Sequence, residues 1–234
     1  MISAGDAIGL LLVYLYIAGV VVFAKLLDRM GVDDCKRKTV HILAGNIVFI
    51  WWMFDSRFIM AFLAAAPFIP LLYLVSPSSK SDKFKRTFLG AASKEGHDLG
   101  LVYYAISWTL IALFLFDYRV AASVGIVAMA YGDGIGGLIG KRLGKRKLRG
   151  DKTLEGTVAI LISTTVITIV VLLFYQWLNG MGMYQCNVLE LPIILGLAPL
   201  IGLYVALLEL FTPGKFDNLL IPITTTLILI AIGV

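Results

Sequence analysis

The chain has 234 residues, of which 59% are hydrophobic and 15% charged, and its formal net charge is +5. Its mean hydropathy of +0.91 excludes a soluble globular domain of this size and predicts an integral membrane protein in a lipid bilayer. No nucleic-acid partner is expected, because the Lys and Arg residues gather in short segments between apolar runs instead of covering a soluble surface.

Eight apolar runs divide the chain, and most are close to the ~20 residues that a helix needs to cross a bilayer. They cover residues 8–24, 39–54, 57–75, 99–116, 119–140, 154–178, 190–211 and 217–234. The sequence therefore predicts an all-α, polytopic membrane helix bundle of about eight transmembrane helices, in a single domain over residues 1–234. The second run is short, so the number of spans could differ by one. The first run lacks a basic leading region and a cleavage site, so no removable signal peptide is expected.

The basic residues set the expected orientation. Eight spans would gather four segments on one side of the membrane: 25–38, 76–98, 141–153 and 212–216. Every Lys and Arg except Arg57 and Arg119 lies in these segments. By the positive-inside rule this side is cytoplasmic, so both termini are expected on the non-cytoplasmic side. Cys35 and Cys186 then lie on opposite sides, and no disulfide between them is expected.

Polar residues lie near the starts of two apolar runs on the basic side of the membrane. On a helix that starts near residue 39, His41 shares a face with Arg37 one turn earlier. Such a histidine is as readily a packing residue as a group that handles protons. The segment 76–98 mixes basic and apolar residues, as an interfacial amphipathic helix does, and it ends near Glu95. Glu95 could take part in proton transfer or could be a loop residue in water.

The segment 131–156 carries the densest chemistry. Its glycines recur at every fourth position: Gly132, Gly136, Gly140 and Gly144. On a helix they form a bare stripe that a second backbone or a phosphate chain can approach closely. The glycines alone favour helix packing, because small residues four apart are a common contact between membrane helices. Asp133 favours function instead, because an ionisable group inside a membrane helix is costly. Together with the cations that follow, it predicts a site for a metal-bound polyphosphate.

Two common nucleotide motifs fail here. A GxGxxG pattern begins at Gly132, but no strand precedes it and this composition forms no βαβ unit. A phosphate-binding Walker loop is excluded because Lys141 is followed by Arg142, where Ser or Thr is needed.

The motif Lys152-Thr153-Leu154-Glu155-Gly156 opens the sixth apolar run. Thr153 is expected to cap the helix, and Glu155 is expected in its first turn, where the helix dipole favours a carboxylate. A helix N-terminus beside lysines is a natural seat for phosphate. The basic loop could equally serve only to set the membrane topology.

A second group of oxygen ligands is expected where the seventh run ends. Pro213 breaks that helix at the same depth as Asp133. Glu209, Asp217 and Asn218 could therefore face that carboxylate. Mg²⁺ prefers such hard oxygen ligands and usually shares them with substrate phosphates.

Taken together, these motifs resemble the CTP-dependent polyprenol, dolichol and phytol kinase family, which is related to the CDP-diacylglycerol synthases. The residues that carry the resemblance occur in the family's order: Arg37-Lys38-x-x-His41, Gly132-Asp133 with Gly140 and Gly144, Lys152-Thr153-x-Glu155-Gly156, and Thr212-Pro213-x-x-x-Asp217-Asn218 before Pro222. The synthases share the Gly-Asp and Lys-Thr-x-Glu-Gly elements, but their long signature rich in Asp, His and Gly is missing from this sequence. The kinase branch is therefore favoured. Because the chain is shorter than eukaryotic dolichol kinases, a phytol- or geranylgeraniol-type alcohol is as well supported as dolichol.

The resemblance implies transfer of the γ-phosphoryl group of CTP, or of another pyrimidine nucleotide, to an isoprenoid alcohol at the cytoplasmic face. Such transfer needs charge neutralisation and alignment more than covalent catalysis. Asp133, Asp217 and Asn218 would hold Mg²⁺, and His41 or Glu95 would handle the proton of the alcohol. The expected nucleotide-binding residues are Arg37, Lys38, Gly132, Gly136, Gly140, Lys141, Gly144, Lys145, Lys152, Thr153, Glu155 and Gly156. A homodimer is left open.

Two other functions stay open. A cytidylyltransferase that makes CDP-lipids would use the same site, but a lipid phosphate would attack the α-phosphorus and pyrophosphate would leave. A transporter would use Asp133 and Glu209 to bind ions or relay protons. The gathering of charged groups on one face disfavours transport, because a transport site is expected near the midplane of the membrane.

Overall fold

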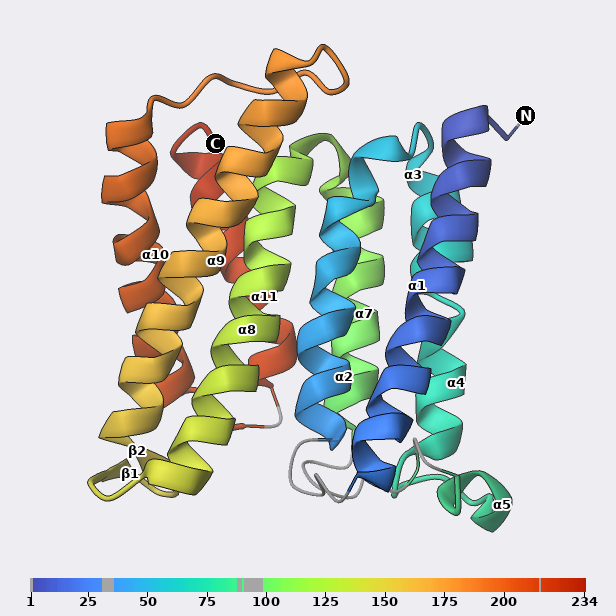
Figure 1. Cartoon of the computed structure of the whole chain (residues 1–234), viewed down its shortest axis with the longest axis vertical. Helices are drawn as coiled ribbons and strands as arrows, with labels where there is room; N and C mark the ends of the chain where they lie inside the picture. Colours follow the sequence, from blue (N-terminus) through green and yellow to red (C-terminus); the bar gives the residue numbers. More distant parts are fainter. Residues whose placement is uncertain (1, 31–35, 88–89, 91–98, 215) are drawn as a thin grey trace. The chain divides into compact units, whose positions relative to one another are not determined.

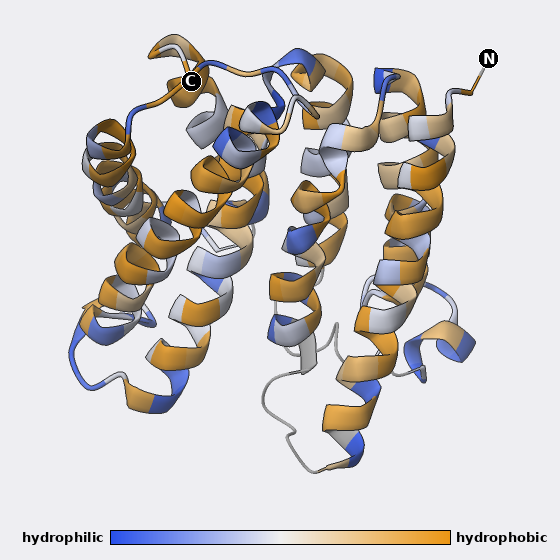
Figure 2. Cartoon of the chain, turned by 45° about the horizontal axis from the view of Figure 1, so that its top comes forward, coloured by the Kyte–Doolittle hydropathy of each residue, from blue (hydrophilic) through white to orange (hydrophobic). Residues whose placement is uncertain are grey.

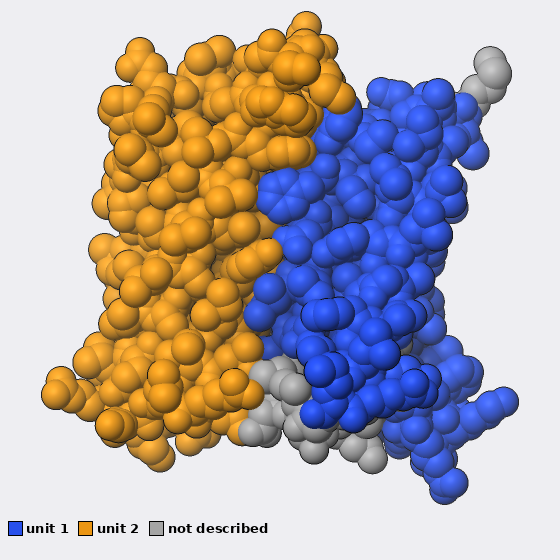
Figure 3. Space-filling model, in the orientation of Figure 1, with its two compact units in different colours: residues 1–116, 214–219 blue, residues 117–213, 220–234 orange. Residues whose placement is uncertain are grey.

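The computed structural model describes residues 2–30, 36–87, 90, 99–214 and 216–234. Two compact units make up these residues (Figure 3): unit 1 comprises 1–116 with 214–219, and unit 2 comprises 117–213 with 220–234. The single domain predicted for residues 1–234 stays a prediction, because a unit defined by contacts within the chain need not be a separate domain.

Helical elements occupy all eight predicted apolar runs (Figure 1). The main elements of unit 1 are α1 (Ala4–Arg29), α2 (Lys36–Gly45), α3 (Arg57–Ile59), a π-helix (Met60–Ala65), α4 (Phe68–Val75) and α7 (Gly100–Phe114). Short 3-10 turns at Asn46–Phe49 and Trp51–Met53 follow α2, a third spans Phe116–Tyr118, and α5 (Asp82–Lys85) lies in the predicted amphipathic segment. The helices α8 (Arg119–Leu143), α9 (Leu154–Gly180), α10 (Leu191–Phe211) and α11 (Asp217–Ala231) complete the chain.

Within the described residues, five helices are long and apolar enough to cross a membrane: Ala4–Leu27, Arg57–Val75, Phe116–Leu143, Leu154–Gly180 and Leu191–Phe211. Two shorter helices, α7 and α11, are also apolar. Figure 2 shows hydrophobic residues along these helices, with hydrophilic residues mainly at their ends. The prediction of an all-α membrane bundle is therefore confirmed. Eight spans and the orientation of the termini stay predictions.

Helix α8 forms the centre of unit 2. Of its membrane-spanning stretch 67% is buried, against 33% for α9 and for α10. Every residue from Val120 to Ala130 is buried, and most of them are small or β-branched. A Cβ atom on Gly125 would lie 2.3 Å from Thr226 Oγ1 and 2.5 Å from the Pro222 carbonyl oxygen, so α11 approaches α8 closely there. Small side chains allow such approaches between membrane helices.

The basic loop 141–153 contains a short antiparallel hairpin that the sequence did not predict. Strands β1 (Lys147–Arg149) and β2 (Lys152–Thr153) pair across a turn at Gly150, whose φ of 57° favours glycine. Residues 141–151 are exposed throughout. The hairpin therefore presents its cations to the surroundings on an ordered turn at one end of unit 2 (Figure 1).

Cys186 provides a test of the predicted orientation, because it lies in the loop after α9, outside the membrane-spanning segments. Burial raises the pKa of the Cys186 thiol, so the reactive thiolate is scarce at neutral pH and increases as the pH rises. In a Cys35→Ser background, we expect a membrane-impermeant maleimide to label Cys186 on intact cells slowly at pH 7 and faster at pH 9. Val188→Cys, at a position 75% exposed in the same loop, should react quickly at both pH values. Labelling that needs permeabilised cells would reverse the orientation.

Candidate functional site: a carboxylate cluster beside a basic hairpin

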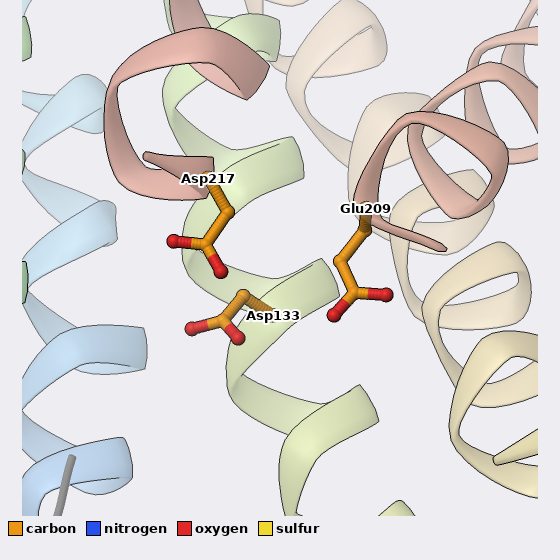
Figure 4. Close-up of side chains that lie close together, drawn as sticks. All are labelled: Asp133, Glu209 and Asp217. Carbon is orange, nitrogen blue, oxygen red and sulfur yellow. The ribbon is translucent and has the colours of Figure 1, made fainter. Parts of the chain in front are cut away.

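Carboxylates from three helices meet where α10 ends and α11 begins, beside a turn of α8 that lies ten residues before the end of α8. Asp133 comes from α8, Glu209 from the last turn of α10 and Asp217 from the first residue of α11. Figure 4 shows the three side chains pointing toward one another, and one oxygen of each lies within 4.8 Å of the others. Glu209 and Asp217 are buried and Asp133 is half-buried. The structure thus brings together two residues predicted as metal ligands, Asp133 and Asp217, and adds Glu209.

The cluster concentrates negative charge in a place with little water. Two unit charges about 4 Å apart interact by about 4 kcal/mol at an effective dielectric constant near 20, so three carboxylates repel one another substantially. The ammonium group of Lys152 offsets part of this charge: its Nζ lies 2.5 Å from Glu209 Oε1 and also donates to the Glu209 carbonyl oxygen. A further cation would stabilise the arrangement, because three carboxylates outnumber one ammonium group.

The oxygen atoms present suit Mg²⁺. Carboxylate and amide oxygens are the hard ligands that this ion prefers. Beside Asp217, the Oδ1 atom of Asn218 is buried and accepts no hydrogen bond within the described residues. Its Nδ2 atom donates to the Gly100 carbonyl oxygen at 2.9 Å, which fixes the amide. A buried oxygen without a donor is costly unless an ion or another polar group satisfies it. The ligand set therefore fits the predicted metal, whose binding stays a prediction.

The Lys152–Gly156 motif organises the hairpin and the start of α9. The Thr153 hydroxyl accepts a hydrogen bond from the Gly156 N–H at 3.2 Å, which confirms the predicted helix cap. Glu155 lies in the first turn, as predicted, and its Oε2 atom accepts from the N–H groups of Lys145 (3.1 Å) and Arg146 (3.3 Å). These contacts tie the chain after α8 to the N-terminus of α9. Thr153 and Glu155 therefore have structural tasks, and their predicted nucleotide contacts stay untested.

The glycine stripe of α8 faces α9. A Cβ on Gly132 would lie 2.8 Å from Thr164 Oγ1, and one on Gly136 would lie 2.2 Å from Ile160 Cγ1. Further along, a Cβ on Gly140 would lie 3.2 Å from Thr153 Oγ1. Gly144 is similarly crowded by the Gly140 carbonyl oxygen and by Thr153. The stripe thus serves close helix packing, the alternative that the glycines alone favoured. Direct nucleotide binding by these glycines stays a prediction without support from their surroundings.

The remaining predicted residues are distributed as follows. Lys141 and Lys145 are exposed at the end of α8 and before the hairpin, and Lys38 is half-buried on α2. His41 lies on α2 in unit 1, where it is 2% exposed and its ring centroid is 4.5 Å from that of Tyr104. Glu95 and the side chain of Arg37 lie outside the described residues.

Two features of the site were missed in the predicted ligand set. Glu209 was placed in the second group of oxygen ligands by the sequence but not among the metal ligands. Lys152 was expected to hold phosphate, a role that stays a prediction, and its pairing with Glu209 across 57 residues of sequence was not predicted. The helix break at Pro213 indicated the depth at which Glu209 lies. No local sequence pattern, however, identifies Lys152 as the partner of Glu209.

Breaking the ion pair should destabilise the protein. Lys152→Met removes the countercharge of Glu209 and leaves its carboxylate, 12% exposed, beside two others. We expect a loss of about 3–5 kcal/mol, the usual cost of removing one partner of a buried ion pair. Thermal unfolding in detergent would show this as a lower midpoint. Adding Glu209→Gln to Lys152→Met should recover most of the loss, and additive losses in the double variant would contradict the pairing.

Comparisons with known proteins provide independent information. The chain is 29% identical to the phytol kinase of Synechocystis sp. over 222 residues, which cover 91% of this chain and 86% of the relative. It is 23% identical to the probable chloroplastic phytol kinase of Triticum aestivum, over 86% of this chain and 68% of the relative. It is 25% identical to the chloroplastic phytol kinase 1 of Arabidopsis thaliana, over 83% and 65%. No protein-family model matches the chain, and no solved structure matches it significantly.

Proposed function

Because the chain belongs to the phytol and polyprenol kinase family, we propose that it is a lipid-alcohol kinase. It transfers the γ-phosphoryl group of CTP, or of another pyrimidine nucleotide, to an isoprenoid alcohol of the phytol, geranylgeraniol or dolichol type. The observation that carries this proposal is the similarity to a phytol kinase over 91% of the chain, which takes in most of its helices. The carboxylate cluster and the adjacent cations suit this chemistry.

In phosphoryl transfer, the acidic groups serve the metal ion and the basic groups serve the phosphates. Asp133, Glu209 and Asp217 would hold Mg²⁺, with the Asn218 oxygen as a further ligand. These residues would thereby supply a cation that neutralises and aligns the phosphates. Lys152 stands at the edge of the cluster, where its ammonium group can turn from Glu209 to a phosphate oxygen. The exposed cations of the hairpin attract the nucleotide and neutralise its charge.

The two substrates approach the site from different sides. The nucleotide is soluble in water and reaches the exposed hairpin, which we place on the cytoplasmic face by the positive-inside rule. The alcohol is soluble in lipid, so it approaches from the bilayer with its hydroxyl near the membrane surface. The reaction then gives a lipid monophosphate and a nucleoside diphosphate.

A direct assay tests the function. The purified full chain in detergent is incubated with Mg²⁺, geranylgeraniol or phytol, and CTP labelled at the γ-phosphate. We expect label in the lipid phase, and less of it when UTP or ATP replaces CTP. Label released as pyrophosphate on addition of a lipid phosphate would establish the cytidylyltransferase instead. No transfer with any combination of these alcohols and nucleotides would overturn the kinase and favour a transporter.

A further inference from the structure

A pocket opens inside unit 1, among α1, α2, α4 and α7. It contains about 720 Å³ of space not filled by protein atoms, its open mouth included. Concave sites lined mainly by apolar side chains are typical of small-molecule binding. The lining is aliphatic and aromatic apart from His41, and its residues include no carboxylate, ammonium or guanidinium group. A nucleotide would leave its phosphates without partners there. The pocket therefore suits an apolar chain.

Small residues on three sides create this space. Ala64 and Ala65 end the π-helix Met60–Ala65 and line the pocket, together with Ala44 of α2 and Ala105 of α7. A π-helix is rare, and single π-turns within helices are frequently found at functional sites. Here the last two residues of the π-helix, both alanines, lie against the cavity.

Hydrogen bonds hold the walls in place. The Tyr14 hydroxyl of α1 donates to the Leu63 carbonyl oxygen of the π-helix at 2.6 Å. The Tyr16 hydroxyl donates to the Leu43 carbonyl oxygen of α2 at 2.8 Å. These bonds join α1 to the π-helix and to α2, and so resist displacement of two walls of the pocket.

The polar end of the pocket lies where α2 and α7 begin. His41 and Leu101 line it near the first turns of these helices, while Ile47 and Trp108 line it further along. Trp108 lies seven positions after Leu101 on α7, a length of about 10 Å at 1.5 Å per residue. The Tyr104 hydroxyl donates to the His41 carbonyl oxygen at 3.2 Å and so fixes the imidazole-bearing turn. The shape matches a ligand with one polar end and an apolar chain.

We propose that this pocket holds the hydrocarbon chain of the isoprenoid alcohol, with the hydroxyl end toward His41. The choice of an isoprenoid alcohol rests on the proposed function. A branched chain suits the lining, because the four alanines leave recesses between larger side chains that methyl branches can fill. A phospholipid fits less well, because the lining residues offer its charged headgroup no countercharge within the pocket itself.

Photolabelling tests the site without turnover. A geranylgeraniol analogue with a diazirine on its chain is irradiated with the full chain in detergent, without nucleotide, and the labelled residues are located by mass spectrometry. We expect labels on the pocket-lining residues of α2, α4 and α7, displaced at least tenfold better by unlabelled geranylgeraniol than by octadecanol. Ala105→Phe should fill the cavity and lower the labelling at least fivefold. Leu110→Phe is the matched control, because Leu110 is 37% exposed on the same helix.

A second variant with a smaller added side chain controls for misfolding of Ala105→Phe. Ala44→Leu adds less volume on a different wall and should lower the labelling in the same direction, with an unfolding midpoint close to that of the parent protein. Labels located elsewhere, equal displacement by octadecanol, or unchanged labelling in both filled variants would each overturn the assignment. Phosphoryl transfer with labelling elsewhere would reject the pocket alone, whereas labelling in the pocket without transfer would reject the kinase alone.

Discussion

Asp133→Asn should lower kcat for phosphoryl transfer by on the order of 10³-fold, the scale seen when a group that stabilises transition-state charge is removed. The substitution keeps the size of the side chain but removes one of three charges that lie within 4.8 Å of one another. If these carboxylates hold Mg²⁺, the variant also needs a higher Mg²⁺ concentration for half-maximal rate. Initial rates across a Mg²⁺ series measure both effects.

The same variant separates metal binding from folding. Without Mg²⁺, the three carboxylates repel one another, so Asp133→Asn should unfold at the same temperature as the parent protein or higher. A bound ion stabilises the folded state, by about 2.7 kcal/mol when its concentration is 100 times the Kd. Saturating Mg²⁺ should therefore raise the unfolding midpoint of the parent protein and raise that of the variant less.

Asp117→Asn is the matched control for charge. Asp117 is exposed and lies just before α8, whose first residue, Arg119, is about 21 Å along the helix axis from Asp133. It should change neither the rate nor the response to Mg²⁺. If Asp133→Asn retained full activity with an unaltered requirement for Mg²⁺, the cluster would not be the metal site of the reaction.

The sequence predicts the helices of this protein well because a bilayer imposes strict conditions on them. Runs of about 20 apolar residues form helices in lipid, since the backbone must satisfy its own polar groups. The predicted run 154–178 corresponds to the observed Leu154–Gly180, and Thr153 caps it as its hydroxyl and position suggested. Local chemistry also located the end of α10 and the start of α11, where two of the three clustered acidic residues lie.

Other features depend on contacts that no local pattern reveals. The hairpin β1–β2 lies within a charged segment, without the alternation of apolar residues that would indicate strands. The π-helix differs from an α-helix by one residue in a turn, which composition does not show. Lys152 and Glu209 meet only because α9 and α10 are adjacent in space. The spacing of the glycines could not distinguish packing from phosphate binding, because both require the same missing side chain.

Gly136→Ala should destabilise the protein strongly, because the glycine stripe sets how closely α8 approaches α9. The added Cβ would lie 2.2 Å from Ile160 Cγ1 and 3.2 Å from the Gly156 carbonyl oxygen. Ile160 is 3% exposed, so its side chain has little room to move. Overpacking costs about 1–3 kcal/mol, whereas alanine in a helix gains only about 0.5–1 kcal/mol over glycine. The expected net effect is a loss, measured as a lower unfolding midpoint in detergent.

Two comparisons show whether the loss comes from this contact. Gly180→Ala, at the end of α9, meets no atom within 4 Å and should be neutral or slightly stabilising. Ile160→Ala removes the atom that the new Cβ would approach, so Gly136→Ala should cost less in that background than in the parent protein. The difference between the two backgrounds is the energy of the clash.

The kinetics of Gly136→Ala then distinguish packing from nucleotide binding. If the stripe only packs against α9, the KM for CTP should stay within about twofold of the parent value below the unfolding midpoint, because the altered atoms face Ile160. If the glycine lies against the phosphates, the added methyl group should raise KM with the midpoint unchanged. A raised KM for CTP with unchanged stability would therefore indicate that Gly136 contacts the nucleotide. A lowered unfolding midpoint with an unchanged KM would support a structural role.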